Sequence, residues 1–328
     1  MSLNNSHLWG VILAGGEGTR LKEYVRTVFG HERPKQYCTF IGTRSMLRHT
    51  LDRAQSVIPR ENLLAVINRH HLPYASDQMQ DLAPENIIVQ PCCRETAAGI
   101  LLPLLYVIRR DPEAIVALFP SDHFILQEVR FMGMVAGACE FASAHPRLLV
   151  VLGVDPQYPE TEYGWLERER GALAGRDAAF YRVKRFWEKP DEETASALQS
   201  RECLWNTFVS VGKAKTLLAL IRGLLPELER PFRKLEGALG STHERQTLEE
   251  VFASIPPLNF SRSVLERIPE RLRVLGVTGV YWSDWGDPRR IQNDVERFSN
   301  VFRDRLAAKP CLDRPPMMVS YPPGRNGN

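Results

Sequence analysis

The sequence predicts an α/β fold built on a doubly wound, mainly parallel sheet, and three observations indicate it. Short apolar runs of strand length recur through the first half of the chain. Stretches of helical length and spacing separate the later runs, and glycine-rich or acidic residues follow the ends of several of them. Strands that alternate with helices form βαβ units, in which consecutive strands pair in parallel. A helical insertion and a small C-terminal helical extension complete the expected fold.

The first half of the chain supplies the regular part of this pattern. Residues 97–109 and 129–143 have helical length and spacing, and each lies between two apolar runs. Ligands of doubly wound sheets gather at the carboxyl ends of the strands, where Gly15, Asp122 and Asp155 would emerge. The runs that predict buried strands are residues 9–13, 63–67, 87–90, 115–119 and 148–152.

The second half is less regular. Its predicted strands are residues 163–167, 180–188 and 273–282, and its predicted helices are residues 214–224 and 289–305. Residues 226–257 are helix-rich and charged, with breaks expected at Pro231, Gly237 and Gly240. We divide the chain into a main domain at 1–288, a C-terminal helix at 289–309 and a Pro-rich tail at 310–328, which we expect to be disordered.

Composition restricts the class of protein. The apolar content of 44% and charged content of 25% in 328 residues are those of a globular protein. A net charge of +3 with scattered basic residues does not indicate nucleic-acid binding. No apolar run approaches the roughly 18 residues of a membrane span, so no membrane partner is expected. Six cysteines without paired zinc spacing predict reduced thiols in a cytoplasmic enzyme.

The segment from Leu13 to Leu21 carries the strongest chemical signal. Three glycines in four positions let successive backbone N–H groups converge on phosphate oxygens. Arg20 adds a charged fork that suits phosphate, and Lys35, in Pro-Lys-Gln, adds a compact second charge. No Gly-Lys-Ser/Thr follows as in a Walker A loop, and Leu21 stands where a dinucleotide fingerprint needs a small residue. A plain turn stays open for the glycines alone.

Two acidic segments are candidates for a metal site. Asp122, in Phe-Pro-Ser-Asp-His, ends the fourth predicted strand, and a carboxylate there suits Mg²⁺. A helix cap without metal is the alternative. Asp284, in Trp-Ser-Asp-Trp-Gly-Asp, is the second candidate carboxylate. Adjacent His70 and His71, in contrast, would point opposite ways on an extended segment and chelate one ion poorly.

Together these motifs resemble the signature of sugar-1-phosphate nucleotidyltransferases, and the Pro-Lys-Gln form looks most like mannose-1-phosphate guanylyltransferases. Isoprenoid-pathway cytidylyltransferases also carry Pro-Lys-Gln-Tyr, so that segment alone does not choose between them. The resemblance spans about residues 9–290 and implies a Rossmann-like nucleotidyltransferase fold. It departs from the family at Gln90, Glu95, Phe208 and Trp285.

The resemblance also implies roles for individual residues. Asp122 and Asp284 would hold Mg²⁺ or another divalent cation, and the catalytic set would be Arg20, Lys35, Asp122, Lys189 and Asp284. The sugar phosphate would contact Gly164, Glu188, Lys189 and Asn206. The nucleotide would contact Leu13, Ala14, Gly15, Gly16, Gly18, Thr19, Arg20 and Asp122, with Gln90, Arg94, Glu95 and Thr96 at its base. The alternative for Thr96 is a helix cap.

The implied reaction joins GTP and mannose 1-phosphate to give GDP-mannose and pyrophosphate by direct in-line attack. A phosphomonoester is already an anion near neutral pH, so this attack needs no general base. Another sugar or another NTP is the alternative within the class, and an inactive regulatory homologue is the alternative outside it. A homodimer is compatible with the sequence.

Overall fold

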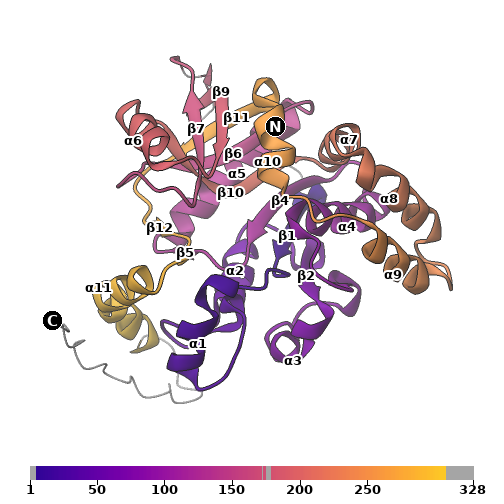
Figure 1. Ribbon diagram of the computed structural model, residues 1–328, viewed down its shortest axis with the longest axis horizontal. Helices are drawn as coiled ribbons and strands as arrows, with labels where there is room; N and C mark the ends of the chain where they lie inside the picture. The colour runs from indigo at the N-terminus through magenta and orange to yellow at the C-terminus, as the bar shows by residue number, and fades with distance from the viewer. Residues whose placement is uncertain (1–4, 172, 175–178, 308–328) are drawn as a thin grey trace.

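A computed structural model describes residues 5–171, 173–174 and 179–307, and the predicted Pro-rich tail at 310–328 lies outside these residues. Its centre is a large twisted sheet with helices on both faces (Figure 1). The spatial order of its strands is β3 (Ile87–Gln90), β2 (Leu63–Asn68), β1 (Leu8–Leu13), β4 (Ile115–Pro120), β10 (Leu204–Lys213), β6 (Leu149–Val154), β11 (Leu272–Val277), β9 (Ala179–Glu188) and β7 (Gly164–Arg168). The short β8 (Leu173–Ala174) pairs with β9.

The sheet is mixed, and the α/β class is confirmed. Strands β1, β2, β3 and β4 pair in parallel, as do β6 and β11. Strand β10 lies between these two groups and runs antiparallel to both β4 and β6. Strands β7 and β9 form an antiparallel pair at the far edge. The parallel groups therefore end at one edge of the sheet, and β10 begins at that same edge.

The helices divide between the two faces. One face is covered by α2 (Met46–Ala54), α3 (Leu72–Ala75), α5 (Glu128–Ala144) and α6 (Glu192–Ser200). The other is covered by α4 (Glu95–Arg110), α10 (Phe260–Ser263) and the helical insertion, which consists of α7 (Ala214–Leu224), α8 (Pro226–Ala238) and α9 (Glu244–Ser254) (Figure 1). Alternate residues of each central strand enter the two cores: Ile12 packs on one face and Val11 on the other.

A third apolar cluster packs a helix from the first part of the chain against the last described helix. Helix α1 (Lys22–Phe29) and helix α11 (Pro288–Ala307) pack around Phe124 and Trp285. The Trp285 ring is fully buried, stacks on Phe124 at 4.6 Å, and donates its indole N–H to Asp294 of α11 at 2.8 Å. The departure from the family pattern at Trp285 is therefore accommodated by the C-terminal helix.

Two sequence expectations differ from the structure in the second half. Pro231 and Gly237 do not break α8, because Leu228, Phe232 and Leu235 bury one continuous face of that helix and packing outweighs the lost backbone hydrogen bond. The predicted strand at 273–282 is two strands: β11 ends at Val277, and β12 (Trp282–Ser283) pairs instead with β5 (Phe124–Ile125) in a separate ribbon. The break at Gly240 is confirmed.

Candidate active site

The glycine-rich loop after β1 is held through its carbonyl groups. Gln36 donates its side-chain amide to the carbonyl oxygens of Ala14, at 3.0 Å, and Gly16, at 2.8 Å. The Tyr37 hydroxyl also donates to Ala14, at 2.9 Å, and the Asn68 amide donates to Gly15 at 2.7 Å. Because these carbonyl oxygens already have protein donors, the loop's N–H groups are the part of its backbone left to meet an anion.

Two of the three glycines lie where a Cβ would meet a neighbouring residue. Gly18 has a φ of +63°, and a Cβ there would lie 3.2 Å from the backbone nitrogen of Lys35. A Cβ at Gly15 would lie 2.5 Å from the side-chain amide of Gln90. Around Gly16, in contrast, no other part of the described chain lies within 4 Å of a Cβ position apart from its sequence neighbours, so space for a ligand exists there.

The β5–β12 ribbon brings the two candidate carboxylates together. Asp122 comes just before β5, Asp284 comes directly after β12, and Ser283 pairs with Phe124 in the antiparallel register. The buried ammonium group of Lys35 joins the Asp122 carboxylate to the backbone of the Asp284 segment. Its Nζ is 3.0 Å from an Asp122 carboxylate oxygen, and it donates to the backbone carbonyl oxygens of Asp284 and Trp285.

The electrostatics keep both carboxylates ionised. Burial is the largest influence on the pKa values of Asp122 and Asp284 and opposes their ionisation, but Lys35 and the other positive charges and hydrogen-bond donors around them together outweigh it. Both pKa values are therefore held below their ordinary value. Asp284 also accepts hydrogen bonds from Tyr163 at 2.6 Å and Arg290 at 2.8 Å, which lower its pKa further. The edge of the sheet thus holds two ionised carboxylates, one paired with Lys35 and the other with Arg290.

Sequence reasoning missed the residues that fix Asp284. One carboxylate oxygen accepts from the Tyr163 hydroxyl, the Gly286 N–H and Arg290 of α11, whereas the other lies 3.7 Å from Arg20. Arg290 is itself held by Glu160 at 2.6 Å. Tyr163 directly precedes Gly164, which the sequence did single out, but Arg290 belongs to a charged helical stretch whose sequence gives no signal of this contact.

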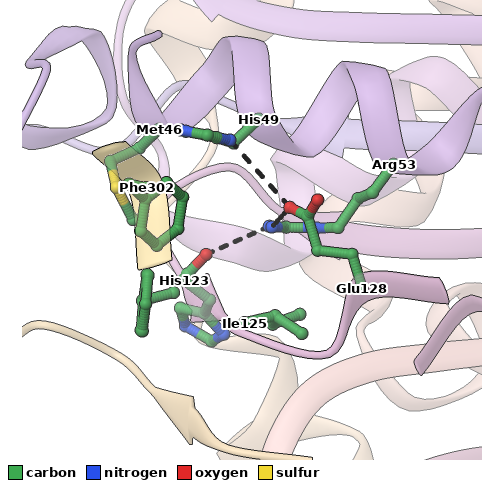
Figure 2. Close-up of a pocket in the computed structure, with 8 residues that line it drawn as sticks. Met46, His49, Arg53, His123, Ile125, Glu128 and Phe302 are labelled. Carbon is green, nitrogen blue, oxygen red and sulfur yellow. Dashed lines mark hydrogen bonds and ion pairs between the residues drawn. The ribbon is translucent and has the colours of Figure 1, made fainter. Parts of the chain in front are cut away.

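A buried arginine holds the backbone of His123, the residue after Asp122 (Figure 2). The Arg53 guanidinium donates to the backbone carbonyl oxygen of His123 at 3.0 Å and pairs with Glu128 at 3.4 Å. These groups line a small cavity with His49, whose ring also faces Glu128. Burial lowers the pKa of His123 to about 4, so its ring is neutral near pH 7. The ring accepts a hydrogen bond from the Trp282 indole at 3.2 Å, which fits a structural role.

The predicted sugar-phosphate residues lie on neighbouring strands. Gly164 of β7 pairs directly with Glu188 of β9, and Trp205, next to Asn206 in β10, pairs with Trp165. The Asn206 side chain is buried and accepts the N–H of Phe208 at 3.1 Å. The structure therefore brings Gly164, Glu188 and Asn206 together at the edge of the sheet.

One carboxylate joins the two predicted phosphate-binding cations. Glu162 Oε2 lies 3.4 Å from Arg20 of the glycine-rich loop and 3.1 Å from Lys189, which follows β9. All three side chains are about half exposed. Arg20 and Lys189 thus face the same anionic position from opposite segments of the chain.

Among the predicted base-reading residues, Gln90, Arg94 and Thr96 contact different parts of the protein, and Glu95 is exposed. Gln90 is buried beside the loop and donates to Asn68 at 2.6 Å, while Glu95 is exposed, with a φ of 61°, at the start of α4. Arg94 donates to the carbonyl oxygen of Phe252 at 2.7 Å, and the Thr96 hydroxyl accepts the N–H of Phe260 at 2.8 Å. Thr96 is not a helix cap, because α4 begins before it, at Glu95.

The histidine pair corrects another expectation. Arg69–His71 forms a turn of 3₁₀-helix rather than an extended segment, and the two rings lie with centroids 4.2 Å apart. Both rings face the carboxylate of Glu17, a residue of the glycine-rich loop. Burial lowers the pKa of His71, so its ring is neutral near pH 7.

Replacement of Glu188 by glutamine is expected to stabilise the protein at pH 8 and to leave stability at pH 4–5 unchanged. Burial raises the pKa of Glu188 to about 7, against an ordinary value of 4.5. The protonated side chain contributes fully to the free energy of unfolding below pH 4.5, and this contribution is lost as the pH rises through 7. For a half-buried group we expect ~1 kcal/mol, or about 2 °C in Tm.

Thermal unfolding measured across the pH range tests this effect. Glu193→Gln, at an exposed position of α6, is the matched control. Equal gains at both pH values, or no gain at pH 8, would contradict the burial of an ionised Glu188.

Comparison with known proteins agrees with this geometry. Residues 9–294 match the nucleotidyl transferase family. The chain is 31% identical over 287 residues to mannose-1-phosphate guanylyltransferase of Escherichia coli K12, covering 86% of this chain and 58% of that one. It is 32% identical over 280 residues to xanthan biosynthesis protein XanB of Xanthomonas campestris, covering 84% and 57%. It therefore spans less than two thirds of the length of these relatives.

A solved structure has the same fold. The crystal structure described as mannose-1-phosphate geranyltransferase from Thermus thermophilus matches with a TM-score of 0.72 and 26% identity, covering 87% of this chain and 79% of that one. The matched family region contains the glycine-rich loop, Lys35 and both carboxylates. It also contains strands β7, β9 and β10, which carry the predicted sugar-phosphate residues. The chain belongs to the nucleotidyl transferase family.

Proposed function

We propose that this chain transfers a nucleotidyl group from GTP to mannose 1-phosphate, forming GDP-mannose and releasing pyrophosphate. The observation that carries the proposal is the buried Lys35 ammonium that joins Asp122 to the Asp284 segment beside the glycine-rich loop. The names of the relatives, mannose-1-phosphate guanylyltransferase and a xanthan biosynthesis protein, support this sugar and this base and suggest a precursor of polysaccharides.

To catalyse this reaction, the protein must align the two substrates and neutralise the negative charge of their phosphates. The sugar phosphate is a dianion near pH 7 and attacks the α-phosphorus directly, so no general base is needed. The glycine-rich loop and Arg20 bind the β- and γ-phosphates. Lys189, directly after β9, binds the phosphate of the sugar phosphate, and Glu188 at the end of β9 accepts hydrogen bonds from the sugar hydroxyls. Lys35 offsets charge near the α-phosphate. The neutral His123 is not required as a proton acceptor.

The residues present fit a divalent cation. Asp122 and Asp284 offer carboxylate oxygens whose pKa values are held low, which is the donor set that Mg²⁺ prefers. These two residues would hold the ion, and when bound it would neutralise oxygens of the nucleotide phosphates. Tyr163 and Arg290 keep the Asp284 carboxylate in its orientation.

Two further observations bear on the setting of the reaction. The described cysteines, Cys38, Cys92, Cys93, Cys139 and Cys203, are free thiols, which supports a reducing, cytoplasmic environment. Within the described ranges, the helices are too short or too polar to span a membrane.

A panel of GTP, ATP, CTP and UTP against mannose 1-phosphate and other hexose 1-phosphates tests the proposal through pyrophosphate release. We expect GTP with mannose 1-phosphate to give the highest kcat/KM. Another preferred pair would correct the substrates but keep the reaction. No pyrophosphate release with any pair would favour an inactive regulatory homologue.

Glu95→Gln is expected to lower the preference for GTP over ATP by at least about tenfold. Its carboxylate can accept the N1–H and N2–H₂ donors of guanine, whereas an amide places N–H where one donor already points. The measurement is kcat/KM for both nucleotides in the wild type and the variant. Glu85→Gln, an exposed carboxylate before β3, is the matched control. An unchanged ratio would remove Glu95 from base selection and leave the reaction intact.

A further inference from the structure

Glu17, His70 and His71 form a cluster outside the carboxylate pair. Their ligand atoms, one from each residue, all lie within 4.8 Å of one another, and the sequence argument against such a cluster rested on an extended backbone that the structure does not have. Glu17 Oε2 is 3.0 Å from His70 Nε2 and 3.7 Å from His71 Nε2. These values bracket the separation of about 3.4 Å expected between ligands of a tetrahedral ion with bonds of about 2.1 Å.

The hydrogen bonds of His71 leave one ring nitrogen without a proton. The single proton of the Tyr37 hydroxyl goes to the carbonyl oxygen of Ala14 at 2.9 Å, so this hydroxyl receives a hydrogen bond from His71 Nδ1–H at 3.3 Å. In the neutral ring Nε2 then carries a lone pair. This nitrogen is fully buried, has no hydrogen-bond partner among the described residues and faces the Glu17 carboxylate.

A lone pair beside a carboxylate is an unfavourable arrangement unless a cation lies between them. The carboxylate itself is fixed, because its other oxygen accepts the Asn68 amide at 2.8 Å. Tyr37 and Asn68 thus orient two of the three donor groups, as the outer contacts of metal ligands do in known sites. His70 and Glu17 are about half exposed, so solvent reaches the fourth position.

We infer that Glu17, His70 and His71 bind one transition-metal ion of the zinc class, with water in the fourth position. Two imidazoles and a carboxylate suit Zn²⁺ or Co²⁺ better than Mg²⁺, which prefers oxygen ligands. Such an ion would tie the glycine-rich loop to the end of β2, since Glu17 belongs to the loop and both histidines follow that strand. This site is separate from the Asp122–Asp284 pair and does not depend on the proposed reaction.

The test is metal binding by the full-length, tag-free and nucleotide-free chain in excess Mg²⁺, which saturates sites made only of oxygen ligands. Titration with Co²⁺, followed by its visible absorption, is expected to give one tetrahedral ion per chain, and Zn²⁺ is expected to displace it. His70→Ala and Glu17→Gln, both at exposed positions, are each expected to weaken binding by at least about 100-fold. His71 is avoided because its buried ring also contributes to packing.

His31→Ala removes an exposed histidine outside the cluster and is the matched control, with binding expected to be unchanged. Absence of saturable Co²⁺ binding, or wild-type affinity in both cluster variants, would overturn the inference. Absence of nucleotidyl transfer in a wild-type chain that binds Co²⁺ would count against the proposed function alone.

Discussion

Replacement of Lys35 by methionine is expected to lower kcat by roughly 10²–10³ with folding retained, as loss of a preorganised charge typically does. The ammonium group is buried, lies 3.0 Å from Asp122, and donates to the backbone at Asp284 and Trp285. Methionine keeps the length and apolar stem of the side chain but leaves two carboxylates without their shared cation. Pyrophosphate release in steady state and in a single turnover measures the loss.

Lys22→Met is the matched control, because Lys22 is exposed in α1 and pairs only with Glu32 among the described residues. Lys35→Arg keeps the charge but not the compact shape, so it should recover little activity. Near-wild-type turnover in Lys35→Met would remove this residue from the reaction.

Asp284→Asn is expected to slow turnover by a similar factor and to raise the Mg²⁺ concentration needed for half-maximal rate. An amide oxygen still accepts from Tyr163, Gly286 and Arg290, so the surrounding structure is kept. The negative charge that would hold the cation is lost, whereas Arg290 keeps its ion pair with Glu160. Initial rates over a Mg²⁺ titration measure both effects.

Asp287→Asn tests specificity, because Asp287 lies on the same segment and only caps the N–H of Arg289 at 2.8 Å. A wild-type Mg²⁺ titration in Asp284→Asn would exclude this carboxylate from the metal site. Turnover unchanged by excess chelator in the wild type would exclude the metal altogether.

The sequence predicted the parts of the fold whose signals are local. The apolar runs at residues 63–67, 87–90 and 115–119 are strands, and residues 214–224 form α7 with the expected bounds. The glycine-rich loop and Asp122 follow strand ends at one edge of the sheet. Each of these features depends on residues close together in the chain, so periodicity and motif spacing were sufficient to find them.

Strand β10 was missed because its signal is not local. Its residues are buried on both faces, yet Asn206, Thr207 and Ser210 interrupt the apolar pattern. Thr207 is satisfied by donating to the carbonyl oxygen of Leu152 in neighbouring β6 at 2.8 Å, a contact that exists only in the assembled sheet. Phe208 has a φ of 65°, and the pairing register shifts between Asn206 and Ser210. Both irregularities break the sequence pattern expected of a strand.

The candidate active site, too, could be predicted only where its residues belong to local motifs. Arg20, Lys35, Asp122 and Asp284 carry recognisable motifs, and the structure brings them together around one charge cluster. Arg290, Glu160 and the Glu17–His70–His71 cluster depend instead on contacts between distant segments. No spacing in the sequence encodes such contacts, so only the folded chain identifies them.

The place of β10 in the sheet also affects how the nascent chain acquires its structure. Strand β6 pairs only with β10 and β11 among the described strands, and both follow it in the chain. During synthesis β4 and β6 therefore keep open edges until residues 204–213 leave the ribosome. Open strand edges can pair with other chains, and pairing between strands that are far apart in the sequence is slow. Expression truncated before β10 would thus yield an aggregating half-sheet, whereas synthesis past β11 completes the pairing of both central strands.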